Sequence, residues 1–465
     1  MSPSWMRTQW ALCRCLKGPS IRHLPPPGQL GPEQKAFTEP SAAQHDNFVT
    51  SPNASDSVAE KEPESEFVYD TGLKQWLQVL GSFFLFFNSW GVINTWGAYQ
   101  SYYEQELLVG TSSSTIAWIG SLQSFLLMMV GAITGPLFDA GYFRALISVA
   151  AFLMPFGLMM TSLATQYWQL ILSQGICCGL AAGCLFVPSV AILPHYFKNK
   201  KGLANGLAAS GSSIGGVVYP IMFDQLQNKV GFAWATRALG FVSFGTICFS
   251  VSIMRARFQP KEKRKLWQFS AFKEPAFTIF VIAMFVGFLG FYNFLFYVQS
   301  YAIETHIVDP NLGFYLLSML NAASTCGRIG PNFLADHVGP LNMLTPLVTI
   351  TAILAFIWIR VHTVPGIIIL AVLYGFFSGG FVSLPPVVMA TMTPDVRDLG
   401  TRLGMVFTVT SIGLLIGTPI GGAILGDNKN FLGLQLFTAC CLITSTFLFA
   451  TVRFLRTGPN LRTKA

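Results

Sequence analysis

Arg328 is the residue of this 465-residue chain whose type and position point most clearly to chemistry. It lies well inside an apolar stretch, 312–334, where an unpaired guanidinium is costly and therefore faces a water-filled cavity or a partner. Its planar fork suits bidentate capture of a carboxylate. Two interpretations follow from the sequence: Arg328 binds an organic anion, or it stabilises Asp336 or the loop at the end of the same stretch.

Polar and aromatic side chains in other apolar stretches are candidates to surround Arg328. Buried amides in lipid need hydrogen-bond partners, so each of these residues either contacts a substrate or bonds to a neighbouring helix. No carboxylate lies at the middle of any apolar stretch, because the 12 acids after residue 74 fall in loops or near helix ends. The candidate substrate-binding residues are Asn88, Asn94, Tyr292, Asn293 and Asn321, with Gln123 and Tyr297 as further cavity-lining candidates.

Other chemistries find no support in the residues. The nine cysteines have no metal-ligand spacing, and neither paired carboxylates nor His/Cys clusters suggest an intramembrane enzyme. There is no GxxxxGK[ST] phosphate-binding loop. The sequence therefore predicts no catalytic residue, no metal site and no cofactor.

The composition indicates what solvates the chain. Hydrophobic residues make up 52% and charged residues only 11%, whereas soluble domains carry about 25% charged residues. Such a chain is too apolar both for a soluble surface and for overall disorder, so lipid must surround most of it. The net charge of +8 fits basic cytoplasmic loops, and we expect no nucleic-acid partner.

Twelve apolar stretches have the length of about 20 residues that a helix needs to cross a bilayer. They predict an all-α membrane protein with two six-helix halves, 75–254 and 275–454, joined by a basic central loop, 255–274. A polar N-terminal tail, 1–74, is predicted to be disordered, and a short tail, 455–465, ends the chain. The predicted spans are 76–99, 114–137, 145–164, 168–193, 203–225, 233–254, 275–302, 312–334, 343–361, 365–391, 401–425 and 431–453.

Basic residues are distributed unevenly between the loops. With both termini on one side, the loops of that side and the C-terminus hold 17 Lys and Arg, and the opposite loops hold four. The positive-inside rule then predicts that both termini lie in the cytosol, and we expect the protein in the plasma membrane. Residues 1–32 contain four bases and no acid, which leaves a targeting segment as an alternative for that end.

Matching motifs recur at one spacing in the two halves. A six-plus-six repeat of this kind is typical of transporters that rock two halves about a central site. The recurring glycines favour close helix packing. The matched pairs are Asp139 and Asp336, 197 residues apart, Gly179 and Gly375, 196 apart, and Gly206 and Gly404, 198 apart.

Asp139 and Asp336 end the second and eighth stretches, and Arg144 follows the first of them closely. We interpret Asp139, Arg144 and Asp336 as a conformational gate that docks helix ends at the cytoplasmic face in one access state.

Four segments carry a resemblance to a known family. They are 70–76 (DTGLKQW), 87–104, 195–211 (HYFKNKKGLANGLAASG) and 326–336, which begins CGRIGP and ends LAD. Together with the spans they resemble the major facilitator superfamily, and within it the monocarboxylate-porter family in its fungal form, over residues 70–455. The resemblance implies alternating access and transport of lactate-like acids with protons, of riboflavin, or of secondary metabolites outward.

Two departures from the family pattern bear on the mechanism. Animal members carry a lysine in the first span where this chain has Asn94, and an aspartate one turn before the span-eight arginine where it has Ser324. The family's lysine–aspartate proton relay is therefore missing.

The sequence predicts a secondary transporter in the lipid bilayer that moves a small organic acid or related metabolite, either an organic anion or an apolar molecule. The alternative is an efflux pump for a secondary metabolite of a fungal pathway. A non-transporting membrane sensor is a third interpretation.

Overall fold

The computed structural model describes residues 72–197, 200–256, 268–395, 398–426, 431–458 and 463–464, without the side chains of 113, 114, 310, 311 and 314. The predicted N-terminal tail therefore lies outside the described residues except for 72–74. Most of the basic central loop lies outside them as well.

Helices account for the regular structure of both halves in the described part of the chain. The first half contains α1 (Leu73–Asn94), α2 (Trp96–Tyr102), the π-helix η1 (Tyr103–Leu107), α3 (Ser113–Met129), α4 (Gly131–Asp139), α5 (Phe143–Thr161), α6 (Tyr167–Leu170), the π-helix η2 (Ile171–Cys178), α7 (Gly179–Ala191), η3 (Leu193–His195) and α8 (Lys201–Ile253). The second half contains η4 (Phe269–Lys273), α9 (Pro275–Glu304), α10 (Pro310–Val338), α11 (Pro340–Ile357), η5 (Trp358–Arg360), α12 (Val364–Ser383), α13 (Pro385–Met392), α14 (Leu399–Leu425) and α15 (Phe431–Thr457).

These helices occupy all twelve predicted spans. Ten helical segments among the described residues are long and apolar enough to cross a membrane. One of them, α8, covers two predicted spans, because Gly231 with φ 79° breaks it into two helices. The twelfth is α10, which has 29 residues but a more polar sequence than the others. The multi-pass, all-helical fold is thus confirmed.

Local sequence signals explain where several helices start. Proline occupies the first turn of α9, α10, α11, α12 and α13, where its missing N–H has no helical partner to lose and its fixed φ suits a helix. Ser112 caps α3 by accepting a hydrogen bond from the Thr115 amide, and Thr363 caps α12 in the same way through Gly366.

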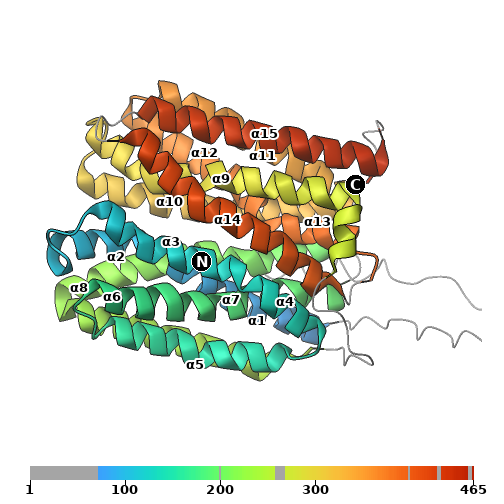
Figure 1. The fold of residues 1–465 in the computed structure, drawn as a ribbon, viewed down its shortest axis with the longest axis horizontal. Coiled ribbons are helices and arrows are strands. Elements are labelled where there is room, and N and C mark those ends of the chain that lie inside the picture. Colours follow the sequence, from blue (N-terminus) through green and yellow to red (C-terminus); the bar gives the residue numbers. More distant parts are fainter. Residues whose placement is uncertain are drawn as a thin grey trace, which may run out of the picture. The chain divides into compact units, whose positions relative to one another are not determined.

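The two halves pack as separate groups of helices that meet along two seams. Figure 1 shows the first half, blue to green, on one side and the second half, yellow to red, on the other. Within the first half α1 packs along α8, and within the second α9 packs along α15 and α10 along α12. The seams are formed by α8 with α10 and by α3 and α4 with α14.

The described end of the central loop is fixed to α14. Arg402 near the start of α14 is 3% exposed, and its guanidinium donates to both carboxylate oxygens of Glu274, at 2.6 and 3.1 Å. It also donates to the Gln268 side chain at 3.1 Å. A bidentate, partly buried pair of this kind fixes the orientation of both side chains, so the loop end and the first turn of α14 are held together.

Candidate functional site

Arg328 lies on the face of α10 that packs against α8. Its side chain is 7% exposed, and its Nε donates to the Ser324 hydroxyl at 3.3 Å and its Nη1 to the Ala209 carbonyl of α8 at 3.5 Å. Both acceptors are neutral and both bonds are long. In the described part of the chain no carboxylate pairs with this guanidinium, so its charge is left without a counter-ion between the halves.

Ser324 contributes to this lack of a counter-ion. It stands one helical turn before Arg328 and offers only a hydroxyl. That hydroxyl accepts from Arg328 and from Ser213 of α8, the second bond being 3.3 Å long. A neutral hydroxyl therefore occupies the position from which a carboxylate one turn away could pair with Arg328.

Asp336, eight residues further along α10, is bonded elsewhere. Its carboxylate accepts the backbone N–H groups of Gly202 at 2.7 Å and Leu203 at 2.9 Å, in the first turn of α8. At 1.5 Å of rise per residue, Arg328 stands about 12 Å from it along the helix. The interpretation in which Arg328 stabilises Asp336 by direct contact is wrong.

The Tyr292 hydroxyl of α9 lies within range of an electrostatic interaction with the Arg328 guanidinium. The Tyr292 ring stacks on Trp90 of α1, with ring centroids 6.1 Å apart and planes inclined by 9°. Trp90 is 2% exposed, and its indole N–H has no hydrogen-bond partner among the described residues. The two stacked rings belong to different halves.

Asn94 and Asn321 both lie against Gly216 in α8. A Cβ atom built on Gly216 would stand 2.8 Å from the Asn94 amide nitrogen and 3.2 Å from the Asn321 side-chain carbon. The Asn321 amide also donates to the Gly216 carbonyl at 3.5 Å. These two predicted residues therefore meet at the seam, on the side of Arg328 away from Asp336.

Asn88 and Asn293 are directed to other neighbours. The Asn88 amide donates to the Phe84 carbonyl and to the Thr246 hydroxyl, and its oxygen accepts from Tyr219, all within the first half. Asn293 lies against Gly421 of α14, inside the second half. The structure thus places two pairs of predicted residues at the interface, Arg328 with Tyr292 and Asn94 with Asn321, but not these two.

The carboxylate of Asp139 crosses the second seam. It accepts the backbone N–H groups of Gly400 at 3.0 Å and Thr401 at 2.6 Å and the Thr401 hydroxyl at 2.7 Å, at the start of α14. It thus repeats the geometry of Asp336 in the other half, an acid docked on a helix N-terminus. Arg144 is exposed in the first turn of α5 and makes no ion pair with Asp139 in the described part of the chain.

Glycines allow the seams to close. A Cβ on Gly404 of α14 would stand 2.2 Å from the Gly131 carbonyl, and one on Gly206 of α8 would stand 2.4 Å from the Arg328 carbonyl. These two glycines are one of the two glycine pairs that match in the sequence. The predicted close helix packing is confirmed at both.

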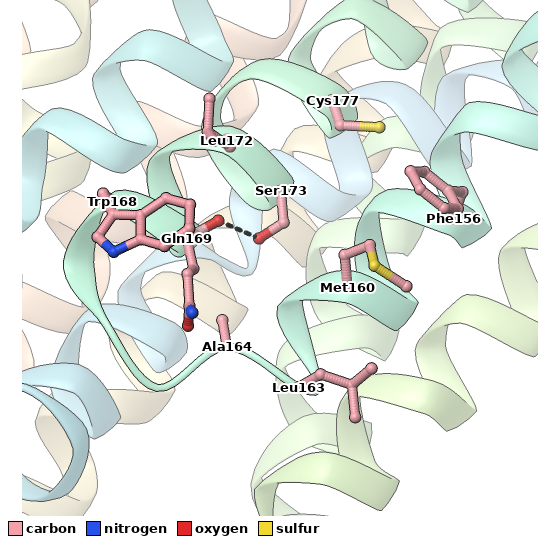
Figure 2. Close-up of a pocket in the computed structure, with 9 residues that line it drawn as sticks. All are labelled: Phe156, Met160, Leu163, Ala164, Trp168, Gln169, Leu172, Ser173 and Cys177. Atoms are coloured by element: carbon pink, nitrogen blue, oxygen red, sulfur yellow. Dashed lines mark hydrogen bonds between the residues drawn. The ribbon is translucent and has the colours of Figure 1, made fainter.

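A pocket of about 320 Å³ lies apart from this interface, between α5 and the helix formed by α6 and η2. Figure 2 shows the Ser173 hydroxyl donating to the Gln169 carbonyl inside it, so this polar group is already satisfied. Leu163 and Trp168 in its wall are 61% and 57% exposed, as expected for side chains that face lipid. None of the predicted site residues lines it.

The sequence reasoning missed Trp90. Tryptophan is common in membrane proteins, so its presence in a span is not informative. Trp90 differs from other tryptophans in that its stacking on Tyr292 of the other half is combined with an indole nitrogen that has no partner among the described residues. A possible signal was its place one turn before Asn94, on the same helix face.

A bundle of membrane-length helices in two halves, with docked acids at one end and a buried cation that no carboxylate of the described residues compensates, is the arrangement of a membrane transporter. The chain belongs to the Major Facilitator Superfamily, whose sequence profile matches residues 79–362 and 332–465.

Curated relatives agree with this class. The chain is 42% identical over 379 residues to the MFS-type transporter dbaD of Emericella nidulans, covering 81% of this chain and 85% of that protein. It is 41% identical over 384 residues to the aspyridones efflux protein apdF of the same species, covering 82% and 78%. It is 36% identical over 402 residues to the agnestins efflux protein AgnL12 of Paecilomyces divaricatus, covering 86% and 91%.

Among solved structures, the fold is similar to that of the transporter FucP in the outward conformation. The TM-score is 0.62 at 17% identity, over 81% of this chain and 98% of that one.

Proposed function

We propose that this transporter exports an organic anion of secondary metabolism from the cytosol across the plasma membrane, and that Arg328 binds the anion. The observation that carries the proposal is the buried guanidinium, which has two long contacts to neutral oxygens. A buried cation without a counter-ion is unfavourable. A carboxylate ligand would remove that penalty and fit the planar fork.

The direction of transport rests on two further observations. Relatives that cover most of this chain are named as efflux proteins for aspyridones and agnestins. The excess of basic residues on one side of the bundle favours a cytosolic location for both termini, and the docked acids Asp139 and Asp336 lie at that same end.

In the proposed cycle Asp139 and Asp336 form the cytosolic gate. Both carboxylates are docked here, so this conformation is closed towards the cytosol. Release of both separates α4 from α14 and α8 from α10, and admits the anion to Arg328 from inside. Redocking then closes the cytosolic side, and the anion leaves outward.

The monocarboxylate-porter family remains our assignment within the superfamily. The 195–211 segment and the CGRIGP motif around Arg328 support it. Because Asn94 and Ser324 replace the relay residues, proton coupling through that lysine–aspartate pair is not expected.

The test compares metabolites inside and outside cells of a deletion strain that carries the wild type, Arg328→Lys, Arg328→Ala or a control. The control is Arg237→Ala, a half-buried arginine that bonds to Ser162 within the first half. Mass spectrometry identifies the acid whose outside-to-inside ratio falls on deletion. Only the wild type and the control are expected to restore that ratio, at equal surface abundance.

Wild-type export by both Arg328 variants would overturn the proposal. Flux is then measured in two sets of proteoliposomes in which the protein is inserted in opposite orientations, with and without a pH gradient. The comparison separates export from uptake of a small acid.

A further inference from the structure

Two aromatic rings face each other across the interface at the level of Arg328. Trp90 and Tyr292 are nearly parallel, with planes inclined by 9°, and are 2% and 5% exposed. They come from α1 in the first half and α9 in the second. Since the halves move relative to each other in alternating access, the distance between these rings changes during the cycle.

The pair has the geometry to hold a flat group. Stacked carbon atoms lie about 3.5–4.0 Å apart, so a planar ligand between two rings needs about 7–8 Å between them. The centroids are 6.1 Å apart and the planes are inclined by 9°, so the rings are already parallel and their planes are at most that far apart. A movement of the halves that widens the spacing between the planes to about 7–8 Å admits a conjugated ring, and the return movement closes both faces on it.

The polar groups nearby define what the flat ligand must carry. The Trp90 indole N–H is only a donor, and it is buried without an acceptor among the residues that the structure describes. Arg328, beside Tyr292, supplies the positive charge. A ligand with a carboxylate at one end and a hydrogen-bond acceptor near its ring satisfies both.

The surroundings of the pair are aromatic on both sides. Trp90 makes an edge contact with Phe186, with centroids 5.6 Å apart, and Phe186 meets Phe407 of α14 at 4.8 Å. Tyr292 lies 6.0 Å from Phe288. Such walls favour an apolar, conjugated body over a small hydrated acid such as lactate.

We propose that the substrate is a planar conjugated carboxylic acid, and that Trp90 and Tyr292 are the residues that select it. This rests on the proposed function, in which Arg328 binds the anion. The Trp90 N–H gives the site a preference for planar acids that carry a hydrogen-bond acceptor over planar acids that lack one. The two rings give it a preference for planar acids over saturated acids.

The test is calorimetric binding of three acids to the purified full-length chain in lipid nanodiscs. The acids are 6-methoxy-2-naphthoate, 2-naphthoate and decahydro-2-naphthoate, which differ in the acceptor oxygen and in planarity. The wild type should bind the planar acids about tenfold more tightly than the saturated acid. It should also prefer the methoxy acid over 2-naphthoate by about three- to tenfold.

Two variants separate the contributions. Trp90→Phe keeps a ring and should remove the methoxy preference alone, whereas Trp90→Leu should also reduce the preference for planar acids. The matched control is Trp358→Phe. Trp358 is also fully buried and its indole N–H also lacks a partner in the described part of the chain, but its ring packs on Phe294 and Tyr301 within the second half. The control should bind all three acids like the wild type.

The outcomes distinguish this inference from the proposed function. Equal wild-type affinity for planar and saturated acids, with loss of both in Arg328→Ala, overturns the aromatic selection and leaves the anion site standing. Absence of binding of every acid to the wild type overturns both. A folded Trp90→Phe variant with the full methoxy preference overturns the role of the indole N–H.

Discussion

Asp336→Asn is expected to weaken closure of the cytosolic gate. The wild-type carboxylate accepts two backbone N–H groups from the first turn of α8, at 2.7 and 2.9 Å, and its charge also interacts favourably with the positive end of that helix. Asparagine keeps one side-chain oxygen, so the variant loses one charge-assisted hydrogen bond.

The size of the effect follows from that loss. A hydrogen bond to a charged group contributes about 1.5–3 kcal/mol. Removing one shifts the ratio of gate-closed to gate-open molecules by about 10- to 150-fold towards open. Asp139→Asn is expected to act in the same direction, and the double variant more strongly than either.

Electron–electron resonance distances between spin labels measure this ratio. Labels on Tyr142→Cys and His337→Cys, in a chain whose own cysteines are replaced, report the separation of the halves at the gate, because both positions are exposed there. The variants should add a longer distance to the distribution. The matched control is Asp224→Asn, which removes a carboxylate near Gly231, at the other end of that part of α8.

An unchanged distance distribution in both single variants and in the double variant would refute the gate. A change of equal size in Asp224→Asn would show that the shift comes from net charge instead of from the docked contacts.

Two other substitutions test the interfaces. Gly404→Val should abolish transport by folded protein, because its Cβ would stand 2.2 Å from the Gly131 carbonyl. The control Gly97→Val, whose Cβ would have nothing within 4 Å, should transport normally. Wild-type flux in Gly404→Val would contradict the close approach of the helices. Asn88→Leu should lower the free energy of unfolding by about 1–2 kcal/mol, because it removes the hydrogen bonds to Thr246 and Tyr219 and interhelical hydrogen bonds in membranes average about 0.6 kcal/mol each. Thermal unfolding measures this loss. An altered substrate preference in this variant would contradict a purely structural role for Asn88.

Hydropathy and spacing were sufficient to locate the membrane helices. Long apolar stretches can satisfy their backbone only as helices in lipid, which is why all twelve ranges were predictable. The prediction was weakest in detail where local geometry decides. The π-helix η2 interrupts the α-helical course of the fourth predicted span, whereas the break at Gly231 falls between two predicted spans.

The positions of the docked acids were also predictable, because Asp139 and Asp336 repeat at one spacing and end matched helices. Their partners were not. Each carboxylate accepts backbone N–H groups at the start of a helix in the other half. Every residue except proline has such a donor, so the residue types do not show which ones bind the carboxylate.

By itself the sequence determined that lipid surrounds most of the chain, how many helices span it, that the two halves repeat and that Arg328 is a buried charge. These properties depend on composition and on distance along the chain. Only the tertiary structure decided which buried polar residues face the interface. Asn88 and Asn94 lie six residues apart on one helix, yet the first bonds within its own half and the second meets Asn321. Trp90 became a candidate only when Tyr292 was brought against it. The rotation of each packed helix sets these neighbours, and that rotation is fixed by contacts between helices far apart in the sequence.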